Sequence, residues 1–468
     1  MNTHYDLIIL GGGASAVAAA IKANELRAKT AIINSDLPVG GTCVNVGCIP
    51  SKLLLHAGEV LHMAKNHGVP GIELEVKNFD FNKIIEDELK IIEGFRKEKY
   101  EKVLANLEHV TYIEGKASFS GEKEVEVNGE KLTADTFIIA TGSTARVPSI
   151  DGIKEVGYVT HIEALKLKRQ PNALAVIGAG PVGLEFAQLY ARFGTQVTIL
   201  QSRERIFPRG EVELITRLSE LLEKEGITIK TNVSVQSARS ENGKKIISYT
   251  VNGEKEEMTV DEILLAAGKT PNTDELHLER PGVEVNKGKA VMVDNNFRTN
   301  VPYIYSAGDV VHLPLRLETT AGHEGTLAAE NALNGKKHSI DYRTVPFAIF
   351  TDPGYASVGL TEDAQMKQSG VCACRTVPFE IIPKASIVRR TEGLIKMGID
   401  PKTKVIVGVH ILALGAPDLI AQAMVLIKNK NTIDDVLNSE PVFPTMSEAI
   451  KYVALSFTKD ISQLSCCI

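Results

Sequence analysis

The sequence predicts an α/β protein with two doubly wound parallel sheets, followed by a C-terminal α+β domain. A short apolar strand, a glycine-rich turn and an alanine-rich helix occur in this order twice, at residues 6–20 and 173–191. An apolar strand follows each copy, at 30–34 and 196–200, which completes the β-α-β unit of a doubly wound sheet. The length of 468 residues allows about three domains of roughly 150 residues each.

Further strands are expected between and after the two units, at 135–143, 261–272 and 303–310, where apolar runs contain or end near glycine. The last part of the chain has a different pattern. A turn at 400–403 separates two apolar runs, which is typical of a β-hairpin. Amphipathic helical runs follow near 417–429 and 445–457. We therefore expect domain borders near residues 150, 268 and 340.

Composition and charge argue against several classes of function. Apolar residues make up 44% of the chain and charged residues 24%, which is typical of a soluble globular protein. The formal net charge of −6 indicates no general attraction to nucleic acid. No apolar run approaches the roughly 20 residues of a membrane span, and the apolar stretch at 5–10 is too short for a signal peptide. We expect a cytoplasmic protein.

Both glycine-rich turns match the dinucleotide-binding fingerprint. The glycines allow a tight turn and let a pyrophosphate approach the backbone, and the following helix offers free N–H groups to that anion. One match would be weak evidence, because a glycine turn occurs in many α/β sheets. Two matches, each between a strand and a helix, predict two cofactors with electron transfer between them. The fingerprint residues are Gly11, Gly13 and Ala16 in the first turn and Gly178, Gly180 and Gly183 in the second.

The ends of the second strands indicate which cofactor binds where. In the second unit Ser202, Arg203 and Arg205 follow the strand, where an acidic residue would bind a bare ribose 2′-hydroxyl. The two arginines favour a 2′-phosphate and hence NADPH, although two solvated surface arginines are the alternative. The first unit then takes FAD. Its strand ends in Asn34, which bonds a ribose less strongly than a carboxylate, so we expect somewhat looser flavin binding.

All six cysteines lie in close pairs, namely Cys43 with Cys48, Cys372 with Cys374, and Cys466 with Cys467. Paired cysteines in a cytosolic chain indicate redox chemistry or soft-metal binding. Cys48 lies just before an expected helix with Pro50 in its first turn, and the helix dipole and Lys52 would favour the thiolate. Two buried, inert cysteines are the alternative. Cys372 and Cys374 flank one residue of a probable strand, so their side chains point the same way. They could bind metal, but we expect surface or core thiols without function.

The segment GGTCVNVGCIPSK at 40–52 resembles the redox-active segment of the pyridine nucleotide–disulfide oxidoreductases. The resemblance covers essentially the whole chain and includes ATG at 140–142, GKTPN at 268–272 and SAGD at 306–309. It implies two Rossmann-like dinucleotide-binding domains, for FAD and NADPH, and a C-terminal α+β dimerisation domain. The implied parts are 1–150 and 269–340 for FAD, 151–268 for NADPH, and 341–468 for dimerisation.

The resemblance also implies residue roles. Cys48 would face the flavin and Cys43 would be the exchanging sulfur, while Lys52 would lie beside the flavin with Glu185 as its partner. Members of the family are homodimers in which the last domain completes the active site of the partner. The other flavin-binding residues implied are Gly41, Thr42, Thr141, Gly142 and Asp309, the last on the ribityl chain.

Two features resemble the mercuric reductase branch of this family. Phe443 occupies the position at which disulfide reductases carry a proton-shuttling histidine, and phenylalanine cannot transfer a proton. The chain ends with Cys466 and Cys467, and a mobile terminal dithiol could pass Hg(II) to another dithiol without loss of metal–sulfur bonds. A frayed tail with two accidental cysteines is the alternative.

This resemblance implies NADPH-dependent reduction of thiol-bound Hg(II) to Hg(0), with Cys43, Cys48, Cys466 and Cys467 as ligands of the substrate metal. Tyr158 matches a family tyrosine near the mercury site, and an ordinary half-buried tyrosine is an equal alternative. Leu360 replaces a second such tyrosine. The chain starts at the flavin strand, so we expect the catalytic core without the N-terminal metal-binding domain of many relatives.

Two other functions stay open on the sequence alone. One is a different disulfide reductase, such as a dihydrolipoamide dehydrogenase, and Phe443 argues against it. The other is a protein that sequesters soft metals through its cysteine pairs without catalysis, for which two dinucleotide sites would have no use.

Overall fold

The first β-α-β unit builds a sheet at the N-terminal end of the computed structural model, which describes residues 4–463. Strand β1 (His4–Leu10) is followed by helix α1 (Ala14–Glu25) and by the parallel strand β2 (Thr30–Asn34). The sheet order is β3-β2-β1-β6-β5-β4, and β16 also pairs with β6. The other strands of this sheet are β3 (Val110–Glu114), β4 (Ala117–Gly121), β5 (Glu124–Val127), β6 (Glu130–Ile139) and β16 (Ile304–Ser306).

Helices α1 and α10 (Glu318–Asn334) pack against each other on one face of this sheet. The approach is very close, because a Cβ atom at Gly325 would lie 2.0 Å from the carbonyl oxygen of Ser15. The alanine-rich sequence of α1 therefore serves packing, since small side chains let two helices meet at short range. This contact fixes α10 beside the first glycine-rich turn.

The second unit repeats the arrangement in a four-stranded parallel sheet with the order β10-β9-β8-β14. A three-stranded antiparallel sheet, β11-β12-β13, lies beside it. The elements are β8 (Ala173–Ile177), α8 (Pro181–Arg192), β9 (Gln196–Leu200), α9 (Val212–Lys224), β10 (Thr228–Lys230), β11 (Val233–Glu241), β12 (Lys244–Val251), β13 (Glu254–Val260) and β14 (Glu262–Leu265).

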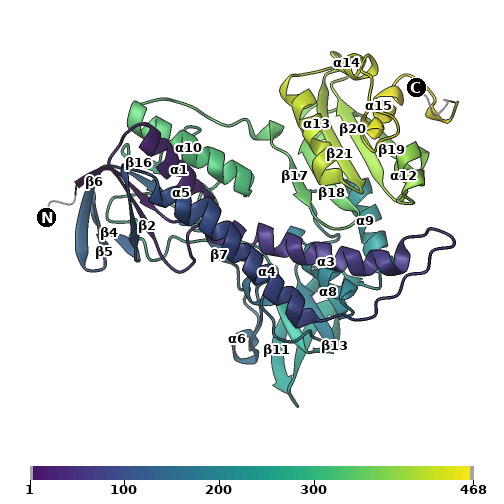
Figure 1. The fold of residues 1–468 in the computed structure, drawn as a ribbon, viewed down its shortest axis with the longest axis horizontal. Helices are drawn as coiled ribbons and strands as arrows, with labels where there is room; N and C mark the ends of the chain where they lie inside the picture. The colour runs from purple at the N-terminus through teal and green to yellow at the C-terminus, as the bar shows by residue number, and fades with distance from the viewer. Residues whose placement is uncertain (1–3, 464–468) are drawn as a thin grey trace.

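Two short strands join the units. β7 (Ser143–Ala145) leaves the first sheet and β15 (Lys269–Pro271) returns from the second, and the two pair antiparallel. Helices α6 (Ile153–Val156) and α7 (His161–Ala164) lie on the outward path. Figure 1 shows the first sheet at the left, the second unit at the bottom and a third sheet at the top right.

The third sheet is antiparallel, with the order β17-β18-β21-β20-β19. The hairpin expected around residues 400–403 is the pair β20 and β21, and the two expected helical runs are α13 and α15. The elements are β17 (Phe347–Ile349), β18 (Gly354–Gly359), α11 (Glu362–Ser369), β19 (Ala373–Pro378), α12 (Pro383–Ile387), β20 (Leu394–Ile399), β21 (Ile406–Ala413), α13 (Ala416–Lys428), α14 (Ile433–Leu437) and α15 (Glu448–Leu455).

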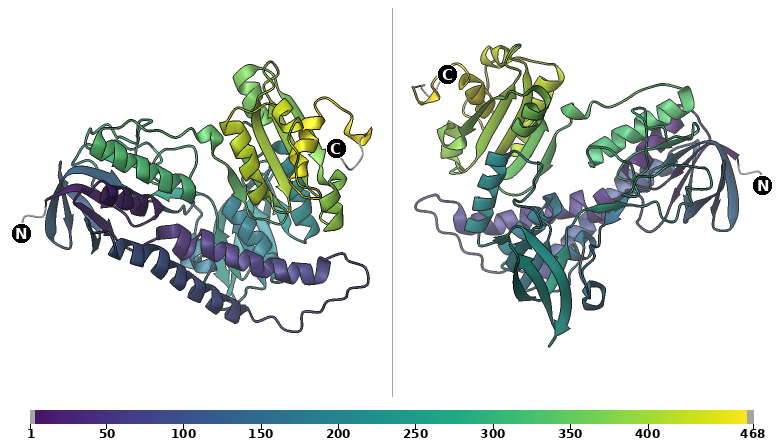
Figure 2. Two further views of the ribbon diagram at one scale, coloured as in Figure 1. Left: turned by 45° about the horizontal axis from the view of Figure 1, so that its top comes forward. Right: turned by 180° about the vertical axis from the view of Figure 1, so that it is seen from behind.

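Long helices connect the units from outside (Figure 2). α3 (Cys48–Asn66) packs against both α8 and α4, and α4 (Phe81–Arg96) continues through a π-helical turn (Lys97–Glu101) into α5 (Lys102–Ala105). None of the helices within residues 4–463 combines the length and the apolar composition that crossing a membrane requires. The predicted α/β fold class is confirmed, whereas the domain borders stay a prediction.

Candidate active site

The loop that carries the first cysteine pair is held directly against the first glycine-rich turn. Cys43 lies in the short helix α2 (Gly41–Val46), and Cys48 is the first residue of α3. Gly41 has φ 60°, and a Cβ atom there would lie 2.6 Å from the Cα of Gly13. Only glycine tolerates both the left-handed conformation and this approach. The sulfurs therefore sit beside the turn that binds a pyrophosphate in dinucleotide-binding proteins.

The two thiols form a polarised pair. They share a side-chain hydrogen bond, which lowers the pKa of Cys48 and raises that of Cys43. The positive charge of Lys52 also lowers the pKa of Cys48, while burial and the nearby Glu318 raise the pKa of Cys43. Cys48 is thus the more acidic sulfur of the pair and Cys43 the less acidic one, so the first residue of α3 is the sulfur more readily converted to a nucleophilic thiolate.

Lys52 links three segments of the chain. Its ammonium donates to Glu185 Oε2 at 2.7 Å, and the side chain of Glu185 is 7% exposed. The other oxygen, Glu185 Oε1, accepts from the main-chain N–H of Phe350 at 2.9 Å, and the ammonium also lies 4.4 Å from the centre of the Phe350 ring. The positive charge of Lys52, four residues after Cys48, thereby joins α3, α8 and the residue after β17.

Sequence reasoning missed a second group beside the cysteines. Glu318, the first residue of α10, has side-chain hydrogen bonds with Cys43 and with Tyr100, whose hydroxyl donates at 3.3 Å. Burial raises the pKa of Glu318, and the negative charge of Asp309 raises it further. No motif or spacing connects residues 43, 100 and 318, so the sequence contained no signal for this cluster.

The first turn fits an FAD pyrophosphate. α1 begins after Gly13, and no side chain caps it, so its first N–H groups stay available for an anion. Gly11 has φ 128°, and a Cβ atom there would lie 2.2 Å from the carbonyl oxygen of Ala140. Asn34 Nδ2 donates to the carbonyl oxygen of Leu37 at 2.8 Å, which leaves its Oδ1 beside Gly12 as the acceptor that a ribose hydroxyl requires.

The motifs at 140–142, 268–272 and 306–309 lie together. Thr141 Oγ1 donates to the carbonyl oxygen of Asn272 at 2.7 Å, and Asn272 Nδ2 donates back to the carbonyl oxygen of Thr141 at 2.9 Å. Ser143 Oγ donates to Asp309 at 2.8 Å. Gly142 has φ 69°, a left-handed conformation that suits glycine. Three stretches far apart in the sequence thus form one edge of the first unit.

The second turn opens into a pocket of about 770 Å³. Four of the predicted cofactor residues line it, namely Gly178, Gly180, Ser202 and Asp309. α8 begins after Gly180 without a side-chain cap, and a Cβ atom at Gly180 would meet nothing within 4 Å, so the backbone is open to a pyrophosphate. A Cβ atom at Gly183 would lie 2.0 Å from the carbonyl oxygen of Gly178, so that glycine serves helix–strand packing.

The pocket also contains residues that were not predicted, among them His161, Lys269 and Arg209. The ammonium of Lys269 lies 3.2 Å from His161 Nε2. Burial, and then the charge of Lys269, lowers the pKa of His161 to about 4, so the imidazole is neutral and accepts this hydrogen bond. Burial also lowers the pKa of Lys269. The signal that could have found Lys269 is its place inside the GKTPN motif.

The predicted NADPH-selecting arginines do not line this pocket. Arg203 is exposed, and Arg205 donates to the carbonyl oxygen of Pro208 at 3.0 Å. Arg209, further along the same loop, is the arginine of this segment that contributes to the pocket wall. Selection of NADPH by Arg203 and Arg205 therefore stays a prediction.

The remaining predicted residues are scattered. Tyr158 is half-buried against the apolar cluster of the second unit, and the side chain of Phe443 is exposed in the loop before α15. The carbonyl oxygen of Leu360 lies 3.2 Å from His410 Nε2. Cys466 and Cys467 lie outside the described residues.

Cys372 and Cys374 form a disulfide, so the expectation of two thiols is wrong: their same-side orientation brings the two sulfurs into bonding contact.

Comparison with known proteins agrees with this geometry. The family model described as pyridine nucleotide-disulphide oxidoreductase matches residues 5–332. This chain belongs to the pyridine nucleotide–disulphide oxidoreductase family. The dimerisation domain of that family matches residues 345–454, which contain the third sheet. Membership of the family implies FAD and a nicotinamide dinucleotide as cofactors.

Several relatives in the family carry the name mercuric reductase. The chain is 39% identical over 465 residues to the protein of Staphylococcus aureus, covering 99% of this chain and 84% of the relative. It is 37% identical over 473 residues to the protein of Streptomyces lividans, covering 100% of this chain and 99% of the relative. A solved structure, the HOCl-induced flavoprotein disulfide reductase RclA from Escherichia coli, matches with TM-score 0.86 and 26% identity, covering 97% of this chain and 100% of that chain.

Proposed function

We propose that this oxidoreductase is a mercuric reductase that uses NADPH to reduce thiol-bound Hg(II) to Hg(0). The observation that carries the proposal is a polarised Cys43 and Cys48 pair beside a dinucleotide-binding turn, in a chain that has Phe443 where a disulfide reductase needs a proton donor. Reduction of Hg(II) releases an uncharged atom and needs no such donor. The mercuric reductases that match nearly the whole chain support the same assignment.

The cofactor sites are proposed from the two turns. FAD, when bound, would supply the relay of an electron pair from NADPH to the cysteine pair. The uncapped N-terminus of α1 would hold FAD and that of α8 would hold NADPH, while the Lys52–Glu185 pair keeps a positive charge next to Cys48. The proposed FAD residues are Gly11, Gly13, Ala16, Asn34, Gly41, Thr42, Lys52, Thr141, Gly142 and Asp309, and the proposed NADPH residues are Gly178, Gly180, Gly183, Ser202, Arg203 and Arg205.

The cysteines would handle the metal by ligand exchange. Hg(II) prefers thiolate ligands, and transfer from one dithiol to another keeps the number of metal–sulfur bonds constant. Cys466 and Cys467 would collect Hg(II) from small thiols and pass it to Cys43 and Cys48 of the other protomer, where two electrons complete the reduction. We accordingly propose a homodimer, to which the dimerisation domain contributes the interface, and a cytoplasmic location.

The test follows NADPH oxidation and Hg(0) release by purified protein with Hg(II) in excess thiol. Serine at Cys43 or Cys48 should abolish turnover. Serine at both Cys466 and Cys467 should slow turnover mainly when Hg(II) carries tightly binding thiols. The proposal is wrong if lipoamide or another disulfide is reduced rapidly while Hg(II) is not, and the delivery role is wrong if the tail variant keeps full activity with every thiol complex.

A further inference from the structure

A second sulfur pair lies on the edge strand of the third sheet. Cys372 and Cys374 form a disulfide at the start of β19, their Cα atoms are 5.7 Å apart, and both residues are half-buried rather than enclosed in the core. β19 pairs with β20 alone, so the strand borders the sheet. The assigned function uses neither cysteine.

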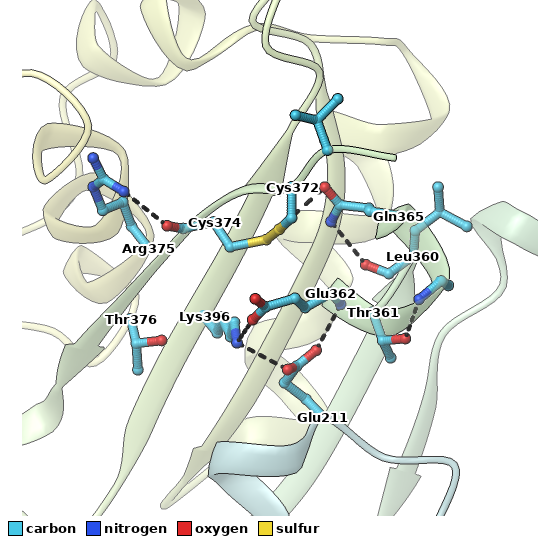
Figure 3. Close-up of a disulfide and its surroundings, with 12 residues drawn as sticks. Glu211, Leu360, Thr361, Glu362, Gln365, Cys372, Cys374, Arg375, Thr376 and Lys396 are labelled. Carbon is cyan, nitrogen blue, oxygen red and sulfur yellow. Dashed lines mark hydrogen bonds and ion pairs between the residues drawn. A yellow bond between two sulfur atoms is a disulfide. The ribbon is translucent and has the colours of Figure 1, made fainter. Parts of the chain in front are cut away.

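Helix α11 places oxygen atoms next to this pair (Figure 3). Glu362, near the start of the helix, has a carboxylate oxygen that lies with both sulfurs in one group, all within 4.8 Å of one another. Gln365, one turn further on, has its Oε1 atom 3.9 Å from the sulfur of Cys374. Two sulfurs and a carboxylate at such separations form a donor set for one cation.

The surroundings carry surplus negative charge. Lys396 is almost fully buried, and three carboxylates approach its single ammonium, those of Glu211 at 2.9 Å, Glu362 at 2.5 Å and Glu213 at 3.5 Å. One ammonium cannot balance three carboxylates. The nearby His410 adds no charge, because burial lowers its pKa.

Arg375, the residue after Cys374, does not neutralise this negative charge. The side chain of Arg375 turns to the opposite side of β19, where it donates to the carbonyl oxygen of Ser456 and stacks 5.5 Å from the Phe457 ring. The sulfur pair therefore faces a carboxylate whose surroundings attract a cation, and the guanidinium of Arg375 does not compete for the position.

A purely structural disulfide explains this arrangement poorly. A cross-link restricts the unfolded chain less as the loop that it closes becomes shorter, and this loop contains a single intervening residue. The bond joins no separate elements, since β19 and the residue before it are continuous. A partly exposed disulfide of this kind is open to attack by thiols, and that chemistry points to a role in exchange.

We infer that Cys372, Cys374 and Glu362 form a redox-gated site for one soft divalent cation, separate from the Cys43 and Cys48 pair. Two molecules of a small monothiol open the disulfide, giving two protein thiols and one oxidised disulfide of the small molecule. The reduced pair then takes the cation from its two monothiol ligands, releasing both as free thiols, while Glu362 supplies a third, oxygen ligand. In the metal-free protein, exchange of the two thiols with one molecule of the oxidised small-molecule disulfide re-forms the Cys372–Cys374 bond, releases two monothiols and closes the site.

The experiment isolates this pair in the full chain. Serine at Cys43, Cys48, Cys466 and Cys467 leaves only residues 372 and 374 as cysteines. This background is reduced with a phosphine, desalted, mixed with Hg(II) in excess monothiol, and passed through gel filtration before mercury and protein are counted. We expect one Hg(II) per reduced chain and almost none on a reduced chain whose two thiols were alkylated with iodoacetamide before the metal was added. Because no NADPH is present, the outcome does not depend on the proposed reductase activity.

Matched variants identify the ligands. Serine at either Cys372 or Cys374 in this background should remove the retained metal, because a single thiolate cannot compete with excess monothiol. Glu362→Gln should weaken binding of Cd(II), used as the probe that favours an additional oxygen ligand, by roughly tenfold or more. Asp363→Asn, at an exposed neighbour on the same helix, should leave the affinity unchanged.

A second measurement guards against loss of folding in the multiple variant. Wild-type protein, fully reduced, should retain one Hg(II) per chain more than the double variant Cys372→Ser/Cys374→Ser, and both should keep the same flavin content. The inference is overturned if the two proteins retain equal mercury, if the disulfide resists reduction in the folded chain, or if Asp363→Asn and Glu362→Gln weaken Cd(II) binding equally.

Discussion

Glu88→Gln tests the packing of the helix that carries Glu88 against the second unit. Glu88 is 2% exposed, and within the described residues neither of its carboxylate oxygens has a hydrogen-bond partner. Glu88 lies on the buried face of α4 together with Phe81, Ile85 and Ile92. A carboxylate therefore occupies a position where an amphipathic helix normally has an apolar side chain.

The size of the pH effect on the free energy of unfolding follows from the pKa of Glu88. Burial raises the pKa of Glu88 from 4.5 to about 8. Between these two values the folded protein keeps a proton that the unfolded chain releases, so stability falls as the pH rises through this window and levels off above about 8. The whole window is worth roughly 4 to 5 kcal/mol, and the part between pH 6 and pH 9 about 2 to 3 kcal/mol.

The assay is urea unfolding followed by circular dichroism at pH 6 and pH 9. Glu88→Gln cannot ionise, so it should gain about 2 to 3 kcal/mol relative to wild type between the two pH values. Glu86→Gln, at an exposed position of the same helix, controls for the loss of charge and should show no such gain. A difference between Glu88→Gln and wild type that is the same at both pH values would refute the reasoning.

Three further predictions concern the cofactor sites and the cysteine loop. Gly183→Ala should lower stability by about 1 to 3 kcal/mol because its Cβ atom would meet a main-chain oxygen at 2.0 Å, whereas Gly180→Ala should keep the melting temperature and raise KM for NADPH. Equal melting temperatures for the two variants would contradict this. Arg203→Ala should lower kcat/KM for NADPH by about tenfold while leaving NADH unaffected, as expected for a lost charged hydrogen bond; an unchanged preference would show that the arginine is only solvated. Glu318→Gln removes a negative charge that raises the pKa of Cys43, so the alkylation profile of Cys43 should shift to lower pH, and an unshifted profile would exclude this influence.

The local motifs were predictable because each reflects a steric requirement at fixed spacing. Gly183 must be glycine for α8 to approach its strand, and Gly178 because it has φ 109° and lies against the carbonyl oxygen of Ala266. Both requirements are visible in the sequence as a fingerprint. The hairpin of the third sheet was predictable for a similar reason, since its turn residues lie between two apolar runs. Such features need no knowledge of distant segments.

The rest of the site depends on contacts between segments that lie far apart in the sequence, with no fixed number of residues between them. Tyr100 and Glu318 come together because the π-helical turn after α4 and the start of α10 both lie beside the cysteine loop. The loop after β9 likewise decides which arginine turns into the pocket, and the structure selects Arg209 over Arg203. The bond between Cys372 and Cys374 could not be predicted either, because the pattern of a strand sets side-chain direction but not oxidation state.

The strand β16 has a consequence for how the protein is made. The first residues of β6 pair with β5, but Phe137–Ile139 pair with β16, which the ribosome delivers only after the entire second unit. Until then the nascent chain carries an unsatisfied sheet edge that can recruit a foreign strand. A fragment that stops before residue 304 should therefore aggregate. The second unit folds as an insertion in the first, and the pairing of its entry strand β7 with its exit strand β15 restricts rotation between the two units.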